Sequence, residues 1–465
     1  MTAPVLLGMM GMVVDGGLLM VAYRQTQNVA DAAAMGAALD KFKGATDDVA
    51  LATAQSLVTN NGLSATLTLN GGASNALNIP PKDPGNTGSP FKNSGNYVEV
   101  MVTQNVNTLF IQVLGINGTQ QVTARAVAGY EPVGAGEGAF VLDPTAAPGL
   151  AVSSNNSRLV VNGDITVNSQ GSGFDQYGNT ITGLYAKPAI TTPGPNTFPA
   201  AIVATTVNSP GGVDILDNIR AYDPAFGPTN WYDPSNTDRP FFAYAPIAPD
   251  PLATLATPTI FSPGVPVLPT PGGDVKVNNG QTISILPGIY TSITVDGGTL
   301  NMATGIYVIK GGNFTSKNGA TINGNPSGGV LLYFTGTTYD PLTGTPDTND
   351  GIATPPVGGI GGGSLNINGG LATLSPLGNT ASPFNGILFY QRRWNTAAAK
   401  VTGNSSSVNF SGTLYAKWAN FNLAGQGQYN AQFLVGSMSI TGGATVTINA
   451  SGKNLGKANL VFLVE

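Results

Sequence analysis

The chain opens with a run of apolar side chains that a single charge interrupts. Residues 3–23 are apolar or small almost throughout, and Asp15 is the only charged residue among them. At 1.5 Å per residue, a helix of this length covers about 30 Å, the thickness of the hydrocarbon core of a bilayer. No Lys or Arg precedes the run, as a cleaved signal peptide would require, and the helical pattern continues through residue 34. We therefore expect residues 1–44 to form a single transmembrane helix and its extension.

The next segment, residues 45–130, mixes helix and strand patterns. Asp47 and Asp48 open an amphipathic stretch that stops at Gly62, which matches the chemistry of helix ends. Alternating strands follow at residues 65–69, 97–103 and 120–128, with a short helix around residues 109–114. These elements predict a small α+β domain of the pilin-like kind. Residues 131–138 are rich in Gly and Pro and predict a linker.

From residue 139 to residue 465 the chain reads as many short strands. Apolar and polar positions alternate between Asn-Gly, Gly-Gly and Pro-Gly turns, which is typical of an all-β domain. Two tripeptides, Gly288-Ile289-Tyr290 and Gly305-Ile306-Tyr307, and two tetrapeptides, at residues 184–187 and 414–417, recur. Short repeated strand–turn units predict a parallel β-helix-like solenoid, with a β-sandwich as the alternative.

Two finer expectations follow from the solenoid. Side chains such as Ile293, Val295, Ile306 and Val308 should point inward and stack between rungs, whereas Thr294 and Tyr307 should point outward. The Pro- and aromatic-rich residues 191–271 should form a long excursion packed against the side of the domain.

The amino-acid composition excludes several kinds of catalytic and binding site. Among its 465 residues there is no His and no Cys, only 9% are charged, and the net charge is −5. The usual general base near neutral pH, thiol chemistry and thiolate zinc sites are therefore excluded. A broad nucleic-acid surface would need a basic face, so no nucleic acid is expected as a partner. Composition favours a structural or binding protein over an enzyme, with no cofactor.

The N-terminal residues also carry a family resemblance. Val14-Asp15-Gly16, Tyr23-Arg24, Gln27-Asn28 and residues 30–34 form a pattern that resembles TadG-like Flp (tight adherence) pilus-assembly proteins. The similarity is densest over residues 5–38 and extends through the strands up to residue 130. The chain departs from the family at Thr26 and Val29 and lacks an Arg-rich lead-in. The resemblance implies a membrane protein whose partners are other pilus-assembly or pilin-like membrane proteins.

Asp15 is the one candidate site residue at this end of the chain. A carboxylate inside a bilayer is expensive, and such residues usually mark a contact or a functional position. One interpretation is a contact between Asp15 and a partner helix of the assembly complex. The other is that Asp15 lies near the membrane surface and is hydrated.

Carboxylates later in the chain suggest, weakly, a carbohydrate-cleaving site. The acidic residues of the excursion lie close in sequence to Arg220 and Arg239; they are Asp214, Asp217, Asp223, Asp233 and Asp238. Aspartates before Pro and in Asn-rich turns are also ordinary turn formers, so we assign no catalytic residue. Residues 347–351 lack the spacing of an EF-hand, and we assign no metal ligand.

Membrane topology carries a conflict. The positive-inside rule, applied to Arg24, Lys41 and Lys43, would keep the bulk of the chain in the cytoplasm. Long domains are translocated largely regardless of charge, and a surface rich in Asn, Thr and Gly is typical of exported proteins. We expect a single-pass bacterial cell-membrane protein with an exported C-terminal part, structural or adhesive in role. The alternative is a tethered carbohydrate-binding or carbohydrate-cleaving β-helix, with surface glycans as partners.

Overall fold

A computed structural model gives the fold as two compact units, each described here by itself. The first unit holds residues 1–133 and 458–465, and the second holds residues 134–457. The structure describes the chain except residues 1, 43–44, 86–87, 90, 96, 115–117, 130–131, 135–136, 195–199, 228–229, 270, 326, 346–361, 404–406, 444, 451–456, 460–461 and 465.

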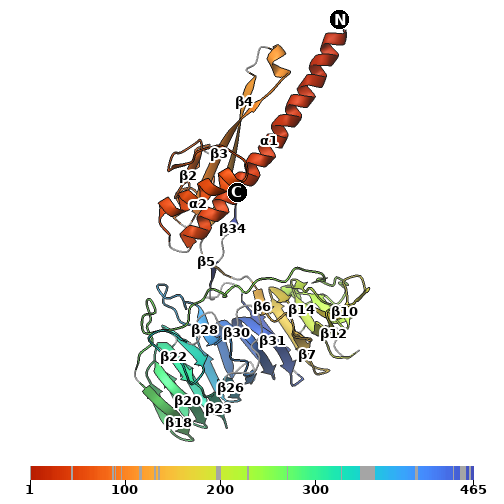
Figure 1. Ribbon diagram of the computed structural model, residues 1–465. Coiled ribbons are helices and arrows are strands. Elements are labelled where there is room, and N and C mark those ends of the chain that lie inside the picture. The colour runs from red at the N-terminus through yellow and green to blue at the C-terminus, as the bar shows by residue number, and fades with distance from the viewer. Residues whose placement is uncertain are drawn as a thin grey trace. The chain divides into compact units, whose positions relative to one another are not determined.

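The first unit places two helices against one small sheet (Figure 1). The helices are α1 (Thr2–Phe42) and α2 (Asp47–Asn60). The sheet has the order β1-β2-β3-β4-β34, from β1 (Thr68–Leu69), β2 (Ala76–Asn78), β3 (Tyr97–Asn107), β4 (Thr119–Gly129) and β34 (Phe462–Leu463). The 3-10 helix η1 (Ile111–Leu114) lies in the turn between β3 and β4.

The two halves of α1 have different surroundings. Its C-terminal half presents a stripe of small residues, including Ala30, Ala33 and Ala37, which are fully buried in one core with strand residues such as Val100 and Ala126. Small side chains let the helix axis approach the sheet closely. In the N-terminal half, several large apolar side chains are exposed instead; they are Val13, Val14, Leu18, Met20 and Val21.

A membrane span remains an expectation. Within the residues that the structure describes, no helix is both long enough and apolar enough to cross a bilayer. The predicted anchor begins in residues 3–10, whose side chains lie outside the described part.

The C-terminus returns to the first unit, which the sequence did not predict. Phe462 and Leu463 of β34 pair antiparallel with Gly129 and Ala128 of β4. The expected boundary, which assigned all of residues 139–465 to one domain, therefore misplaces this strand. Short strands at the two crossings, β5 (Pro132–Gly134) and β33 (Lys457–Asn459), pair with each other. The second unit is thus an insertion between two strands of the first unit's sheet.

The second unit is a closed, parallel, solenoid-like sheet of 24 strands, which fits the predicted β-helix and not the antiparallel sandwich. Its strands form three ladders of parallel pairs. We call these ladders A, B and C. Long strands bend from one ladder into the next, so β20 (Gly288–Asp296), β30 (Val408–Ala424) and β31 (Gly427–Thr441) each belong to more than one.

The remaining strands divide among the ladders. Ladder A adds β22 (Gly305–Lys310), β25 (Val330–Thr335), β28 (Ile387–Gln391), β6 (Glu137–Val141), β9 (Asp164–Val167), β15 (Val207–Asn208) and β17 (Phe241–Phe242). Ladder B adds β18 (Pro271–Asn278), β23 (Phe314–Lys317), β26 (Leu365–Asn368), β29 (Ala399–Thr402), β7 (Leu150–Val152) and β13 (Ile190–Thr191). Ladder C adds β19 (Thr282–Ile285), β21 (Thr299–Met302), β24 (Thr321–Gly324), β27 (Leu371–Leu374), β32 (Thr445–Asn449), β8 (Arg158–Asn162), β14 (Ile202–Ala204) and β16 (Ile219–Ala221).

The order of the rungs differs from the order of the chain. The stack runs from β18 and β19 up to β31 and β32, and the next rung is made by β6, β7 and β8 from the start of the unit. Three short strands stand beside the stack: β10 (Gly171–Phe174), β11 (Thr180–Ile181) and β12 (Tyr185–Pro188). The segment after β17 must therefore run back along the whole stack to reach β18.

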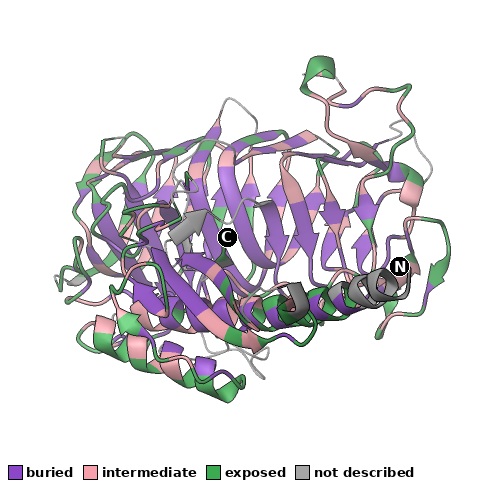
Figure 2. Ribbon diagram, turned by 90° about the horizontal axis from the view of Figure 1, so that it is seen from above, coloured by how far each residue is buried: buried purple, intermediate pink, exposed green. Residues whose placement is uncertain are grey.

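That returning segment covers the outer face of ladder A. Leu252, Leu255 and Val267 are buried in one cluster with outward side chains of the ladder such as Val308 and Tyr333. The predicted excursion is therefore only partly right, because β14 to β17, inside residues 191–271, are rungs of the solenoid. Figure 2 shows the buried strands of the stack.

Because both faces of ladder A are covered, its inward side chains differ in part from those that the sequence predicts. Ile293 and Val295 lie in the interior as expected. Tyr307, which was expected outside, also belongs to the interior core, whereas Ile306 and Val308 face the covering segment. The expectation was wrong for this strand because the alternation of apolar residues does not identify the inner face when both faces are buried.

One of the two sequence repeats places its tyrosines side by side in the interior, although the strands pair two residues out of register, with Gly288 opposite Tyr307. The rings of Tyr290 and Tyr307 stack with centroids 6.0 Å apart, and each hydroxyl donates to a carbonyl four residues earlier, of Leu286 and Ala303. The other repeat does not mark equivalent positions, because Lys187 is exposed while Lys417 is buried in the stack.

Candidate functional sites

The carboxylate of Asp15 is bound by the chain itself. It is 2% exposed and accepts hydrogen bonds from the backbone N–H groups of Leu109, Phe110 and Ile111 at 3.0, 2.8 and 2.6 Å. These residues form the turn that leads into η1. Three donors satisfy a carboxylate without a partner protein. The contact between Asp15 and a partner helix stays a prediction, and the burial of Asp15 does not require it.

Gly11 completes this contact one helical turn away. A Cβ atom at Gly11 would stand 2.4 Å from the Cβ atom of Phe110, so only glycine leaves room for the turn to lie on α1. The sequence contains the short helix around residues 109–114, but nothing local links it to an aspartate more than 90 residues earlier.

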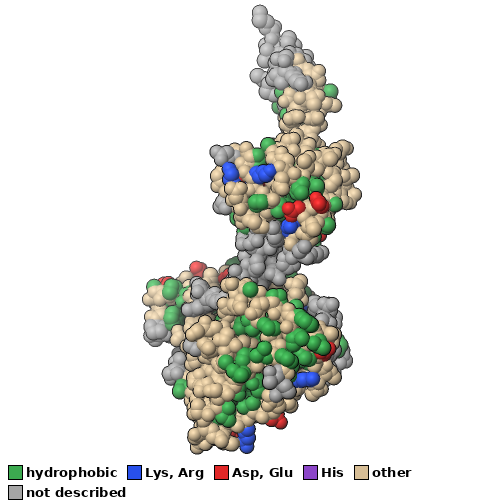
Figure 3. All heavy atoms as spheres, turned by 90° about the vertical axis from the view of Figure 1, so that its left-hand side faces the viewer, with side chains coloured by type: hydrophobic (Ala, Val, Ile, Leu, Met, Phe, Trp, Pro, Cys, Tyr) green, Lys and Arg blue, Asp and Glu red, His purple; other side chains and the backbone are tan. Residues whose placement is uncertain are grey.

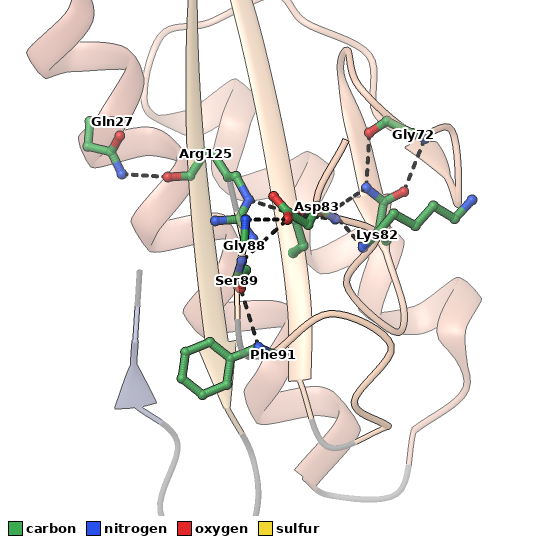
Figure 4. Close-up of polar contacts among 10 residues, drawn as sticks. Gln27, Gly72, Lys82, Asp83, Gly88, Ser89, Phe91 and Arg125 are labelled. Atoms are coloured by element: carbon green, nitrogen blue, oxygen red, sulfur yellow. Dashed lines mark hydrogen bonds and ion pairs between the residues drawn. The ribbon is translucent and has the colours of Figure 1, made fainter. Parts of the chain in front are cut away.

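A second buried carboxylate, Glu99 on β3, organises the sheet of the first unit (Figure 4). Glu99 is fully buried and pairs with Arg125 of β4, whose Nε lies 2.7 Å from the carboxylate. It also accepts hydrogen bonds from the Asn78 side chain and from the backbone N–H groups of Lys82 and Asp83, at 2.7, 3.0 and 3.2 Å. Four donors occupy its oxygens, so Glu99 acts as a clamp between strands and loop.

Hydrogen bonds within the loop after β2 stabilise it further. Asp83 accepts from the backbone N–H groups of Gly88 and Ser89 at 3.1 and 3.3 Å. On the other side of the sheet, Gln27 of α1 donates to the carbonyl of Arg125 at 2.9 Å (Figure 4). The network thus joins α1, the sheet and the loop. The sequence analysis identified the strand at residues 97–103 and missed the role of Glu99.

Most carboxylates of the predicted excursion form turns. Asp223 accepts from the N–H group of Ala225 at the start of η3 (Pro224–Phe226), and Asp233 accepts from the N–H and hydroxyl groups of Ser235. Asp238 belongs to the same Asn- and Pro-rich turn, where its N–H group donates to Asn236. These contacts agree with the turn-forming interpretation.

Asp214 and Asp217 are the exception, because they line a hollow. The hollow measures about 380 Å³ and is also lined by Phe174, Tyr177 and Arg239. Asp217, in η2 (Leu216–Asn218), forms an ion pair with Arg239. Asp214 is held by hydrogen bonds from Thr192, and burial raises the pKa of its carboxyl. Arg220 is not among the lining residues and bonds to the carbonyl of Ile219.

No metal centre emerges from the described residues, none of which cluster as three or more acidic groups able to hold an ion. The candidate calcium loop, residues 347–351, lies outside the described part of the chain.

A buried polar cluster fastens the covering segment to the solenoid. Asp250 lies 3.1 Å from the Lys417 ammonium and accepts a hydrogen bond from the Tyr415 hydroxyl at 2.7 Å. Arg393 donates to that hydroxyl and to the carbonyls of Leu252 and Leu255. Burial, together with the charge of Asp250, raises the pKa of Tyr415 well above its usual range. The Lys417 charge is thus paired with Asp250, and the buried Arg393 guanidinium is satisfied by neutral oxygen acceptors, as burial requires.

Three aromatic residues of the predicted excursion are packed, whereas Phe242 and Tyr244 are 49% and 64% exposed. Tyr222 and Trp231 stack with centroids 5.9 Å apart, and Tyr232 is buried under the Arg158 guanidinium. These contacts support a packing role over a stacking platform for sugars.

Comparison with known proteins identifies the N-terminal region alone. Residues 1–40 match the family described as putative Flp pilus-assembly TadE/G-like, and residues 29–128 match the family described as putative Tad-like Flp pilus-assembly. These matches confirm the resemblance to TadG-like Flp pilus-assembly proteins that the sequence pattern predicts. No curated protein and no solved structure matches the chain.

Proposed function

We propose that this chain, whose first 128 residues match Flp pilus-assembly families, is a membrane-anchored, pilus-associated protein of the bacterial cell envelope. In this proposal α1 tethers the protein, and other pilus-assembly or pilin-like membrane proteins are its partners. The inserted solenoid is exported and acts as a structural or adhesive domain, without catalysis. The family match is the observation that carries the proposal.

Two structural features support a tether at the N-terminus. The exposed large apolar side chains of α1 lie mostly in its N-terminal half, where Val13 is 75% exposed and Val21 is 66% exposed, with Leu39 as an exception. Small side chains of the C-terminal half are buried in the core of the first unit. A helix divided in this way suits one end in lipid and the other in a folded domain.

Membrane flotation tests the tether. We expect the full chain to float with liposomes after a high-salt wash, and a variant lacking residues 2–14 to stay in the soluble fraction. This deletion keeps Asp15 and the buried stripe, so the first unit retains its core. A truncated protein that floats as well as the full chain would refute the tether.

The surface of the second unit supports a structural or adhesive role. Its side chains are largely uncharged, and Figure 3 shows apolar side chains gathered on one face with few Lys, Arg, Asp or Glu residues. Such a surface can contact another protein or an abiotic surface without a strong electrostatic cost.

Glycan binding is a second candidate for the same domain, favoured by the hollow at Asp214. Tyr177 is 81% exposed there, beside an ion pair that offers both donors and acceptors. Aromatic faces and paired charges are suitable contacts for sugar rings. Binding to a glycan array that disappears in Tyr177→Ala, and persists in Phe261→Ala, an exposed aromatic residue on a different hollow, would support this candidate; an array without signal would remove it.

A further inference from the structure

The turn between β3 and β4 is an uncharged, apolar tip. Residues 106–118 contain no Asp, Glu, Lys or Arg. Leu109 is 66% exposed and Phe110 is 44% exposed, whereas large apolar side chains are normally buried in a small domain. We call residues 108–114 the hairpin tip.

The hairpin tip is fixed to the apolar part of α1. Asp15 holds its backbone through three hydrogen bonds, and Phe110 lies against Gly11. Lower on the same hairpin, the Gln104 side chain donates to the carbonyl of Ala22 at 2.9 Å. Figure 1 shows the hairpin running alongside α1. If α1 enters a membrane, the hairpin tip must therefore come to the same depth as Asp15.

The strands that carry the tip cannot follow it into hydrocarbon. Asn105, Asn107 and Gln121 are exposed on them. Near the tip, β3 and β4 pair with each other, and each has an outer edge that no described strand covers. Backbone groups at an open edge have no partner in lipid, and each costs several kcal/mol there. This cost exceeds the gain from burying the few apolar side chains of α1 between Gly16 and Tyr23.

We infer, on the basis of the proposed anchoring, that the hairpin tip lies at the membrane surface as a second, interfacial contact with lipid. Leu109 and Phe110 enter the boundary between headgroups and acyl chains. The part of α1 that enters the hydrocarbon is then N-terminal to Asp15, where residues 2–14 rise about 20 Å into a core of about 30 Å, and residues 16–23 stay outside it. Asp15 stays at the boundary, and the backbone of the tip supplies the hydrogen bonds that water would otherwise provide.

The next residues of α1 fit this placement. From Asp15 to Tyr23 the helix rises about 12 Å, enough to pass through the headgroup layer. Tyr23 is half-exposed and Arg24 is exposed. An aromatic side chain followed by a basic one is the pattern found at membrane surfaces, where the cation meets lipid phosphates.

A depth measurement tests the inference. Because the chain contains no Cys, Leu109→Cys gives one labelling site for an environment-sensitive fluorophore, and the exposed Asn105→Cys, about 13 Å away along β3, is the matched control. The full chain is reconstituted in liposomes of phosphatidylcholine and phosphatidylglycerol. Spin-labelled lipids quench the fluorophore either near the headgroup or near the end of the acyl chain.

We expect strong quenching at residue 109 by the shallow lipid, weak quenching by the deep lipid, and little quenching at residue 105. Stronger quenching at residue 109 by the deep lipid would overturn the surface placement. Equal, weak quenching at both positions in protein that floats would overturn the lipid contact while the anchor stands. Protein that does not float would instead refute the proposed anchoring itself.

Discussion

Two buried carboxylates of the first unit hold separate parts of the chain together. Asp15 and Glu99 are both inaccessible, and each is satisfied by donors that lie far away in sequence. A charge in such a place destabilises the fold when its partner is removed, whereas the loss of both members of a pair is tolerated better.

The variant Glu99→Gln tests whether removing one member of a buried charge pair destabilises the sheet. The amide keeps the shape of the side chain but removes the negative charge that Glu99 places against the Arg125 guanidinium, so we expect a loss of about 3 kcal/mol in the free energy of unfolding. The double variant Glu99→Gln, Arg125→Met should recover part of this loss. Chemical denaturation measures both. A single variant as stable as the parent would show that the pair does not hold the sheet.

At the scale of elements, ladder A differs from the other two ladders because both of its faces are covered. Tyrosines inside the solenoid are removed from water as well, among them Tyr290, Tyr307 and Tyr429. Burial raises the pKa values of Tyr290, Tyr307 and Tyr429, so these hydroxyls keep their protons in the folded chain after an unfolded chain has lost them.

This predicts the pH range over which the solenoid is stable. Without His and Cys, no side chain has an ordinary pKa between about 6 and 9, so stability should be nearly constant there. Above about pH 10 unfolding releases tyrosine protons, so the free energy of unfolding should fall as the pH rises. Melting temperatures across this range, with tyrosinate absorbance, measure the effect. Tyr307→Phe should reduce the alkaline slope and the exposed Tyr177→Phe should not; equal slopes would contradict the assignment.

The covering segment offers a second test at this scale. Asp250→Asn leaves Lys417 buried without a counter-charge, which should cost about 3 kcal/mol and loosen residues 243–269. Hydrogen exchange should show lost protection in this segment first, with the exposed turn variant Asp238→Asn unchanged. Protection that stays the same in both variants would mean that apolar contacts alone hold the segment.

The elements show where sequence reasoning succeeds and where it stops. Local alternation correctly predicts the strands around Ile293 and Val295. It misassigns Tyr307 and Val308, because a distant segment covers their strand. β34 is too short to produce a pattern, and its partner β4 lies more than 300 residues earlier. Asp15 was recognised as unusual, but its partners follow from tertiary structure alone.

At the scale of the whole molecule, the solenoid is inserted into the first unit rather than appended to it. Replacing residues 135–456 by a short Gly/Ser linker should leave a folded first unit, because β5, β33 and β34 remain. Truncation after residue 133 removes β34 and exposes the edge of β4, so it should melt at a lower temperature. Equal melting temperatures would show that the returning strand contributes nothing to the unit.

Thiol labelling from outside the cell tests whether one end of the chain anchors in the membrane while the inserted solenoid is exported. Thr282→Cys places a single thiol on the exposed strand β19 of the solenoid, in a chain that has no other. Spheroplasts that express the full protein are treated with a membrane-impermeant maleimide, before or after detergent lysis. We expect equal labelling in both samples, with a cytoplasmic thiol protein labelled after lysis only. Labelling of Thr282→Cys that requires lysis would place the solenoid in the cytoplasm and refute its export.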